Sequence, residues 1–232
     1  MKRALLRGSI VAAVWLSQIC SAQSPVALFN GKDLSGWVAK GGKARFTVDN
    51  GELVGTAVSD TSNSFLCTEQ VYTDFVFECD FKVAPQLNSG VQFRSECARA
   101  AAPEKAEQRV YGYQAEIDVD PKKNRWWTAG IYDEARRGWL YPGPKGGQAE
   151  AFTEQGRKVS KAGEWNHLRI EAKGDVIKTF LNGAPRAELK DKLSLRGFIG
   201  LQVHGIGKDK RKEGLQVRWR NLTLVDLSGK SN

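Results

Sequence analysis

The sequence predicts an all-β fold in which antiparallel sheets pack as a sandwich or close into a barrel. The chain has 232 residues, of which 41% are hydrophobic and 26% are charged, a composition typical of a globular domain with one buried core. In the segment 75–82, apolar and polar residues alternate without a break, as they do in a strand with one buried face. Similar short runs follow one another along the chain, and helical periodicity is scarce, with room for a turn or two at 98–108.

The predicted strands are separated by turn signals. They are 44–48, 52–57, 64–68, 75–82, 90–95, 113–119, 129–132, 167–172, 176–181, 197–203 and 215–226. Asn50-Gly51, Gly174-Asp175 and Asn182-Gly183 interrupt the pattern at positions where a tight turn is favoured. The close succession of strands is typical of an antiparallel sandwich or barrel and gives no sign of a second domain.

The segment 165–183 carries a more specific signal. It reads WNHLRI, then a Gly-Asp turn, then VIKTFLNG. This pattern resembles a hairpin of concanavalin-A-like jelly rolls, and the resemblance implies a β-sandwich of two antiparallel sheets with a concave sheet that carries the ligand. An ordinary exposed hairpin is the alternative interpretation.

The N-terminus has the pattern of a signal peptide. Lys2, Arg3 and Arg7 precede an apolar stretch at 9–19, and small residues at 20–22 form a cleavage site before Gln23. We therefore expect residues 1–22 to be removed and residues 23–232 to form a single domain in the periplasm or outside the cell. A lipid anchor on Cys20 is less favoured, because Gln18 and Ile19 are bulky for a lipoprotein signal. The rest of the sequence has no apolar run long enough to span a bilayer.

Charge and cysteine content exclude some functions. The formal net charge of +9 falls to +6 without residues 1–22, and part of it lies in the mixed run 208–213, which is typical of a solvated loop rather than a nucleic-acid-binding patch. The remaining cysteines, Cys67, Cys79 and Cys97, allow at most one disulfide, and their spacing is not that of a zinc site. Cys79 belongs to the apolar face of the strand 75–82, which predicts a core position.

Residues two positions apart on a strand share a face, and three predicted strands each place a glutamine beside a titratable residue. The pairs are Gln92 with Arg94, Gln114 with Glu116, and Gln202 with His204, and Glu96, Asp118 and Asp120 continue the first two faces. These side chains offer an acid or base, a cation and amide groups, which suits a sugar or another polyol. A solvated outer face would also alternate, but it would favour Lys, Thr and Ser.

Two further groups of residues could flank this face. An aromatic group consists of Trp126, Trp127, Tyr132, Trp139 and Tyr141. Such rings stack on sugars, although they also serve as core residues. The charged segment 132–139, with Glu134 and Arg137, is either a salt-bridged loop or the rim of a site. Of the two histidines, His204 lies before a glycine at a strand end and is the better candidate for proton transfer, whereas His167 is expected to be structural.

The opening LFNGKDLSGW at 28–37 resembles that of the 3-keto-disaccharide hydrolase family. Further blocks match in order at 88–94, 112–117, 131–137, 197–205 and 217–222. The resemblance covers about residues 27–227 and implies a concanavalin-A-like jelly roll. One position departs from the family pattern, because Glu116 stands where the motif GYQADI has an aspartate.

The resemblance implies cleavage of a glycoside already oxidised to a ketone at C3. The ketone acidifies the C2 proton, so that a base, an enolate-stabilising cation and an acid for the leaving oxygen are sufficient for elimination. We expect Glu116 or His204 to be the base, Arg94 the cation and Glu134 the acid. Substrate contacts are expected from Gln92, Gln114, Asp118, Tyr132, Arg137, Trp139 and Gln202. In an alternative arrangement, Glu116 and His204 share a divalent metal ion that stabilises the enolate.

Two other functions compete with this interpretation. The strand EIDVD at 116–120 resembles the paired-carboxylate strand of laminarinase-type retaining glycosidases, but Asp120 is short for that role and Pro121 ends the strand. A secreted carbohydrate-binding module would use the same face and the same aromatic residues without needing a base.

Overall fold

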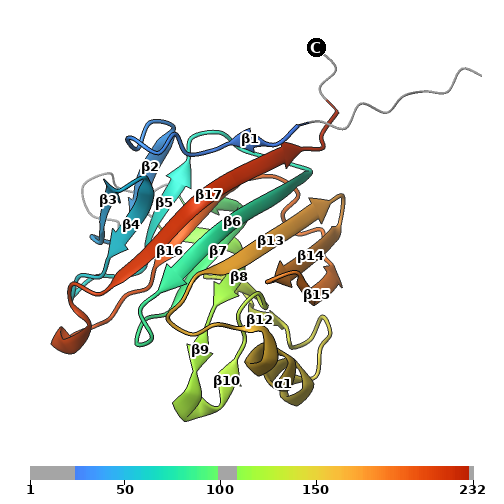
Figure 1. Cartoon of the computed structure of the whole chain (residues 1–232). Helices are drawn as coiled ribbons and strands as arrows, with labels where there is room; N and C mark the ends of the chain where they lie inside the picture. The colour runs from blue at the N-terminus through green and yellow to red at the C-terminus, as the bar shows by residue number, and fades with distance from the viewer. Residues whose placement is uncertain (1–23, 99–108, 230–232) are drawn as a thin grey trace, which may run out of the picture.

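A computed structural model describes residues 24–98 and 109–229, which form a sandwich of two antiparallel sheets (Figure 1). Sheet A has the order β15-β14-β13-β6-β17-β4-β3, with β1 beside β17. Its strands are β1 (Val26–Ala27), β3 (Arg45–Asp49), β4 (Glu52–Thr56), β6 (Phe75–Val83), β13 (Asn166–Lys173), β14 (Val176–Leu181), β15 (Ala184–Lys190) and β17 (Gln216–Asp226). The order of sheet B is β12-β11-β8-β7-β16-β5-β2. Its strands are β2 (Trp37–Gly41), β5 (Ser64–Thr68), β7 (Ser89–Cys97), β8 (Val110–Ile117), β11 (Ile131–Glu134), β12 (Gly138–Tyr141) and β16 (Phe198–Val203). The architecture confirms the predicted jelly-roll sandwich.

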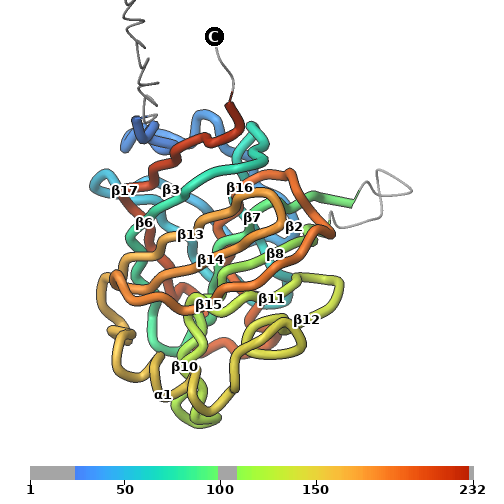
Figure 2. The backbone as a smooth tube through the Cα atoms, turned by 90° about the vertical axis from the view of Figure 1, so that its right-hand side faces the viewer, coloured from blue at the N-terminus to red at the C-terminus, as the bar shows by residue number. Residues whose placement is uncertain are grey.

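Smaller elements complete the structure. At one end of the sandwich lie the ribbon of β9 (Val119–Asp120) and β10 (Arg125–Trp126), the 3-10 turn η1 (Pro121–Lys123) and the helix α1 (Ala149–Val159), whereas the 3-10 turn η2 (Lys210–Lys212) lies between β16 and β17 (Figure 1). Figures 1 and 2 both show β10 and α1 lying together. At the opposite end, β1 lies beside the final part of β17, so the two ends of the described chain are close.

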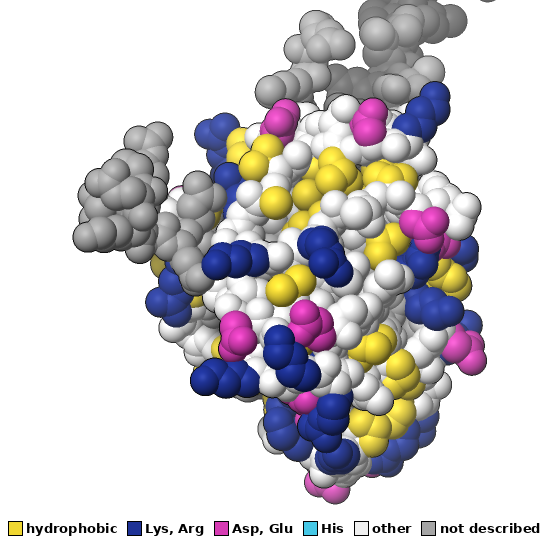
Figure 3. All heavy atoms as spheres, turned by 90° about the vertical axis from the view of Figure 1, so that its left-hand side faces the viewer, with side chains coloured by type: hydrophobic (Ala, Val, Ile, Leu, Met, Phe, Trp, Pro, Cys, Tyr) yellow, Lys and Arg dark blue, Asp and Glu magenta, His cyan; other side chains and the backbone are white. Residues whose placement is uncertain are grey.

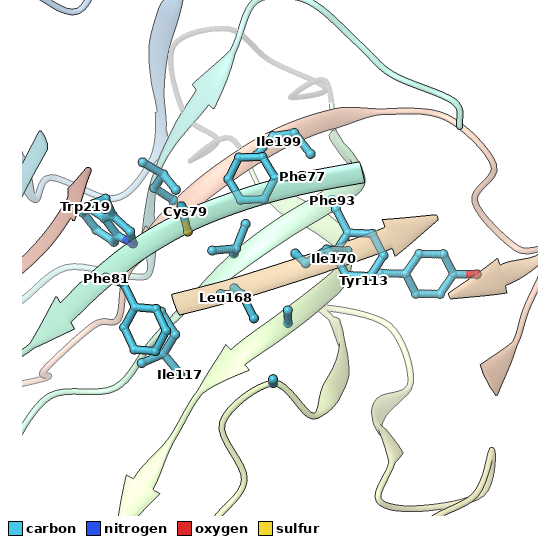
Figure 4. Packing of buried hydrophobic residues seen from close by; sticks show 14 of the residues in the cluster. Phe77, Cys79, Phe81, Phe93, Tyr113, Ile117, Leu168, Ile170, Ile199 and Trp219 are labelled. Atoms are coloured by element: carbon cyan, nitrogen blue, oxygen red, sulfur yellow. The ribbon is translucent and has the colours of Figure 1, made fainter. Parts of the chain in front are cut away.

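The core lies between the two sheets and follows the predicted alternation. Phe75, Phe77, Cys79 and Phe81 of β6 are all buried in the core. Figure 4 shows Phe77, Cys79 and Phe81 among apolar residues of β7 and β8 such as Phe93 and Ile117. Each phenylalanine buried in this way contributes about 2 kcal/mol to stability. The structure confirms Cys79 as a core residue, and Cys67 and Cys79 are buried free thiols.

Two elements, β15 and α1, do not follow the patterns by which the sequence predicts strands and helices. In β15, both Arg186 and Ala187 are buried, because a register irregularity against β14 interrupts the alternation. In α1, only a short face is buried, and Gly156 is needed because a Cβ there would lie 1.9 Å from the carbonyl oxygen of Trp126. Packing against the end of the sandwich therefore stabilises this short helix.

Several expectations concern regions outside the core. The predicted signal peptide, 1–22, lies outside the described residues, as does the expected helical turn at 98–108 apart from Ala98. Within 24–98 and 109–229, no helix has the length and apolarity needed to cross a membrane. On the face shown in Figure 3, basic side chains are scattered among apolar and acidic ones.

Candidate active site

Glu116 lies on the face of sheet B that points away from sheet A. Its neighbours Ala115 and Ile117 belong to the core between the sheets, so the alternation of β8 directs Glu116 to the other side. Glu116 is 5% exposed, and its carboxylate accepts hydrogen bonds on both oxygens. Gln114 Nε2 donates to Oε1 at 2.5 Å, and Asn88 Nδ2 donates to Oε2 at 3.3 Å.

The surroundings of Glu116 favour its neutral form. Burial, followed by the negative charge of Asp118, raises the pKa of Glu116 to about 8, although the donors Gln114 and Asn88 act in the opposite direction. The charge of Glu134 raises this pKa further. A carboxyl group with a pKa close to the working pH can take up or release a proton readily, as an acid or base catalyst must.

Asp118 lies beside Glu116 and is held by its own partners. Arg125 Nη2 donates to Asp118 Oδ1 at 3.0 Å, and Asn88 Nδ2 also donates to this oxygen at 3.3 Å. Asn88 therefore bridges the carboxylates of Glu116 and Asp118. Asp120 is separate, because β8 ends at Ile117 and the Asp120 carboxylate accepts from the backbone N–H of Lys123. The structure thus corrects the expectation that Asp120 continues the face of Glu116.

Glu134 lines an open cavity, and His204 directly precedes Gly205 of the same lining. The cavity has a volume of about 500 Å³, and its lining includes Asn63, Phe65, Arg109, Val110, Glu134 and Gly205. Burial raises the pKa of Glu134, against the hydrogen bond that Asn63 Nδ2 donates at 3.2 Å and the positive charges of His204 and Arg109. The exposed His204 has Nδ1 2.7 Å from the carbonyl oxygen of Gly205. Because a carbonyl only accepts, neutral His204 carries its proton on Nδ1, which leaves Nε2 able to act as a base.

A row of side chains extends from β8 toward the aromatic residues. In the strand register, Gln114 of β8 lies opposite Tyr132 of β11, which lies opposite Trp139 of β12. The ring centroids of Tyr132 and Trp139 are 5.5 Å apart, and those of Trp127 and Trp139 are 4.7 Å apart. The three rings are half-buried, and α1 holds Trp127 through a 2.8 Å hydrogen bond from Nε1 to Thr153. They form an aromatic surface beside the carboxylates, of the kind on which a sugar ring stacks.

Comparison with known proteins identifies the family. The family model described as 3-keto-alpha-glucoside-1,2-lyase-like domain matches residues 24–225. The chain belongs to this family. No curated protein matches this lyase-like chain significantly.

Solved structures share the fold of the lyase-like domain. One glycosyl hydrolase candidate from Parabacteroides distasonis is 20% identical, with a TM-score of 0.55 over 92% of this chain and 98% of its own. A second from the same organism is 21% identical, with a TM-score of 0.52 over 88% of this chain and 100% of its own. A Bacillus subtilis protein of unknown function with a galectin-like fold is 13% identical, with a TM-score of 0.59 over 88% of this chain and 94% of its own. These similarities show a shared jelly-roll fold.

Two predicted site residues of the lyase-like domain lie elsewhere. Arg94 is fully buried and donates to the carbonyl oxygens of Thr73 and Gly174 at 2.7 Å each, and to Asp74 at 2.9 Å. A bulge between Phe93 and Glu96 breaks the alternation, so Arg94 does not share the face of Gln92 as the sequence predicts.

Arg137 lies in the turn between β11 and β12 and is also bound away from the predicted site. It donates to Asp133 at 2.5 Å and to Asp191 at 2.9 Å. Asp133 alternates with Tyr132 and Glu134 along β11, so this ion pair and the carboxylate of Glu134 lie on opposite faces. The structure therefore separates Arg137 from the predicted site.

The three predicted glutamines are all buried but differ in their partners. Gln92 and Gln114 are hydrogen-bonded to each other, with 2.8 Å between Nε2 and Oε1. In contrast, neither polar atom of the Gln202 side chain has a hydrogen-bond partner within the described ranges. A buried amide without partners is costly unless something else satisfies it, so Gln202 is the glutamine best suited to a ligand.

Sequence reasoning missed Asn63, Asn88, Arg109 and Arg125. Asn88 opens the family block 88–94 and could have been noticed there, whereas the other three lie in or beside loops without a periodic pattern. As for a metal, no group of three or more His, Cys, Asp or Glu residues in 24–98 and 109–229 is arranged to hold an ion.

Proposed function

We propose that the protein cleaves the glycosidic bond of a 3-keto-glycoside by elimination followed by hydration. The observation that carries the proposal is the pair of carboxyl groups with raised pKa, Glu116 and Glu134, on one face of sheet B beside His204. The membership of the chain in the 3-keto-alpha-glucoside-1,2-lyase-like family supports a carbohydrate-active enzyme.

The chemistry divides into two balanced stages. A base takes the C2 proton, and the electron pair forms an enediolate with the C3 ketone. As the ketone re-forms, a C1–C2 double bond forms and the bond from C1 to the leaving oxygen breaks, with a proton supplied to that oxygen. Water then adds across the double bond, placing a hydroxyl at C1 and a proton at C2. The sum is hydrolysis.

The residues can be assigned to these steps by position. Glu116 acts as the base in our proposal, because burial beside Asp118 makes its carboxylate a stronger base than an ordinary glutamate. Glu134 supplies the proton to the leaving oxygen. His204 is the second candidate base through its free Nε2.

In our proposal, Arg109 rather than Arg94 supplies the cation that stabilises the enediolate. Arg94 uses its donors on backbone carbonyls and Asp74, whereas Arg109 lines the cavity that contains Glu134. A guanidinium at this position would stabilise the enediolate oxygen. Tyr132 and Trp139 would stack on the sugar and Gln202 would bind a hydroxyl group.

A direct assay tests the proposal. The mature chain, residues 23–232, is incubated with a 3-keto-glucoside and with the unoxidised parent, with and without EDTA, and the released aglycone is measured. We expect cleavage of the keto substrate alone. Loss of activity in EDTA would show that a metal ion stabilises the enolate. Cleavage of the parent compound would contradict the elimination route.

A carbohydrate-binding module is the second candidate, because the half-buried rings of Tyr132, Trp127 and Trp139 form a surface suited to sugars. It predicts sugar binding that survives both Glu116→Ala and His204→Ala, without turnover of either glucoside. The retaining-glycosidase alternative lacks support, since Asp120 belongs to the β9–β10 ribbon. We further propose export, which N-terminal sequencing of the mature protein tests by locating the cleavage after Ala22.

A further inference from the structure

A line of hydrogen-bonded side chains leads along sheet B to Glu116. Ser95 Oγ donates to Gln92 Oε1 at 2.6 Å, and Gln92 Nε2 donates to Gln114 Oε1 at 2.8 Å. Gln114 Nε2 then donates to Glu116 Oε1 at 2.5 Å. Every bond runs in the same direction, so the line ends by presenting an N–H group to the carboxylate.

The fold builds this line from three features. Gln92 and Gln114 are directly opposite each other in the register of β7 and β8, which places their amides side by side. Gly90 lies opposite Glu116, and a Cβ at Gly90 would lie 2.5 Å from Cδ of Gln114, so the glycine leaves room for the Gln114 side chain. The bulge after Phe93 brings Ser95 back toward Gln92.

The members of the line are buried, and their polar groups already have partners within it. Ser95 and Gln114 are 1% exposed and Gln92 is not exposed at all. Gln202 is equally buried, but its amide has no hydrogen-bond partner within the described ranges. The partners of Gln92 and Gln114, rather than their burial, argue against the expectation that these two residues bind substrate hydroxyls. On the other side of the carboxylate, Asn88 holds Oε2, so both oxygens of Glu116 are fixed.

We propose that Ser95, Gln92 and Gln114 are positioning residues that, together with Asn88, hold the Glu116 carboxylate in a single orientation for proton transfer. The catalytic consequence rests on the proposed function, but the orientation and titration of Glu116 do not. An amide donor stabilises the ionised carboxylate, so loss of the donor shifts the Glu116 titration to higher pH. The other charged or titratable groups near Glu116 are Asp118 on the β8–β9 segment, Arg125 on β10, and Tyr132 and Glu134 on β11.

The titration of Glu116 can be measured without any substrate. The full mature chain is labelled with ¹³C at the glutamate carboxyl groups, the Glu116 signal is assigned by its absence in Glu116→Gln, and its shift is followed against pH by NMR. Gln114→Met removes the donor at similar volume, and Asn88→Ala removes the second donor from a half-buried loop position that tolerates change. We expect each variant to raise the pKa of Glu116 by about one unit, the effect of losing one charge-assisted hydrogen bond.

Gln202→Met is the matched control, because it removes a buried glutamine of the same sheet that is not part of the line. We expect it to leave the Glu116 titration unchanged. If the titration also stays unchanged in folded Gln114→Met and Asn88→Ala, the proposal is overturned. A fold-wide disturbance would also overturn it, and would appear as equal shifts in all three variants.

The kinetic constants kcat and KM provide an independent test of the positioning role. Gln92→Met leaves Glu116 its direct donor but removes the group that orients Gln114, so we expect kcat to fall about tenfold with KM retained. An unchanged kcat in this variant would remove Gln92 from the line. If the titration shifts as expected but no 3-keto-glucoside is cleaved by the wild type, the positioning role stands and the proposed function fails.

Discussion

Two clusters of buried or half-buried carboxylates in this protein differ in how their negative charges are compensated. The first is the site around Glu116, Asp118 and Glu134. The second is an ion network in which the acids Asp133 and Asp191 meet the bases Arg136, Arg137 and Lys145. In the network, each carboxylate has at least two cationic partners. In the site, within the described part of the chain, Asp118 pairs with Arg125, whereas Glu116 and Glu134 accept hydrogen bonds from amides.

The pKa values follow this difference. Burial alone would raise the pKa of Asp191, but hydrogen bonds from Arg137 and Tyr113 hold it below its usual range. The pKa of Glu116 rises to about 8, because burial and Asp118 are not offset by a cation of comparable strength. A buried carboxylate with its cations stays ionised and holds structure together, while one without them exchanges protons near neutral pH. The comparison separates an ion-paired cluster from one whose glutamates have raised pKa values.

The largest expected effect is on turnover. Glu116→Gln keeps the shape of the side chain but removes the proton acceptor, so kcat for a 3-keto-glucoside should fall by about 10²-fold to 10⁴-fold. The released aglycone measures it. Glu188→Gln, on the exposed part of β15, is the control and should keep full activity. Full turnover by Glu116→Gln would transfer the role of the base to His204.

The next largest effect is expected on the free energy of unfolding, at Arg94, which the sequence predicted to lie in the site. Arg94→Met leaves the carbonyls of Thr73 and Gly174 without their donor and Asp74 without its cation, which should cost about 3 kcal/mol of the free energy of unfolding. Urea denaturation measures the loss.

Arg211→Met, at an exposed ion pair, is the control for Arg94→Met and should leave the unfolding curve in place. A stable Arg94→Met protein that has lost its turnover would restore the catalytic role that the sequence suggested for Arg94.

Stability should also depend on pH through Glu116. Its pKa is higher in the folded than in the unfolded chain, so the folded state binds more protons between about pH 4.5 and pH 8, and stability falls as the pH rises through that range. Relative to Glu116→Gln, the wild type should therefore lose at least about 1.4 kcal/mol between pH 5 and pH 8, the equivalent of one pKa unit. Parallel denaturation curves for the two proteins at every pH would show that Glu116 titrates normally.

The smallest effect is expected at the aromatic surface. Trp139→Ala should raise KM for the sugar about fivefold with a smaller change in kcat, because ring stacking contributes about 1 kcal/mol. Trp165→Ala, whose ring is covered by Arg220 at 4.1 Å, is the matched control and should not change KM. Equal KM values for the two variants would remove Trp139 from the site.

The sequence by itself determined the jelly-roll sandwich and the strand that carries Glu116. Alternation decides which side of β8 meets the core, and it placed Gln114 and Glu116 together on the opposite face. Family blocks along most of the chain pointed to the same fold and chemistry. These properties are local, since they depend on side chains two positions apart or on contiguous motifs.

Only the tertiary structure decided which charged residues join Glu116. A bulge turned Arg94 away from the site, and partners distant in the sequence bound Arg137 to Asp191. Loops placed Asn63 and Arg109 beside Glu134. The tertiary structure also decides the raised pKa of Glu116. This pKa depends on burial and on nearby charges, which exist only when the strands, loops and ribbon have come together.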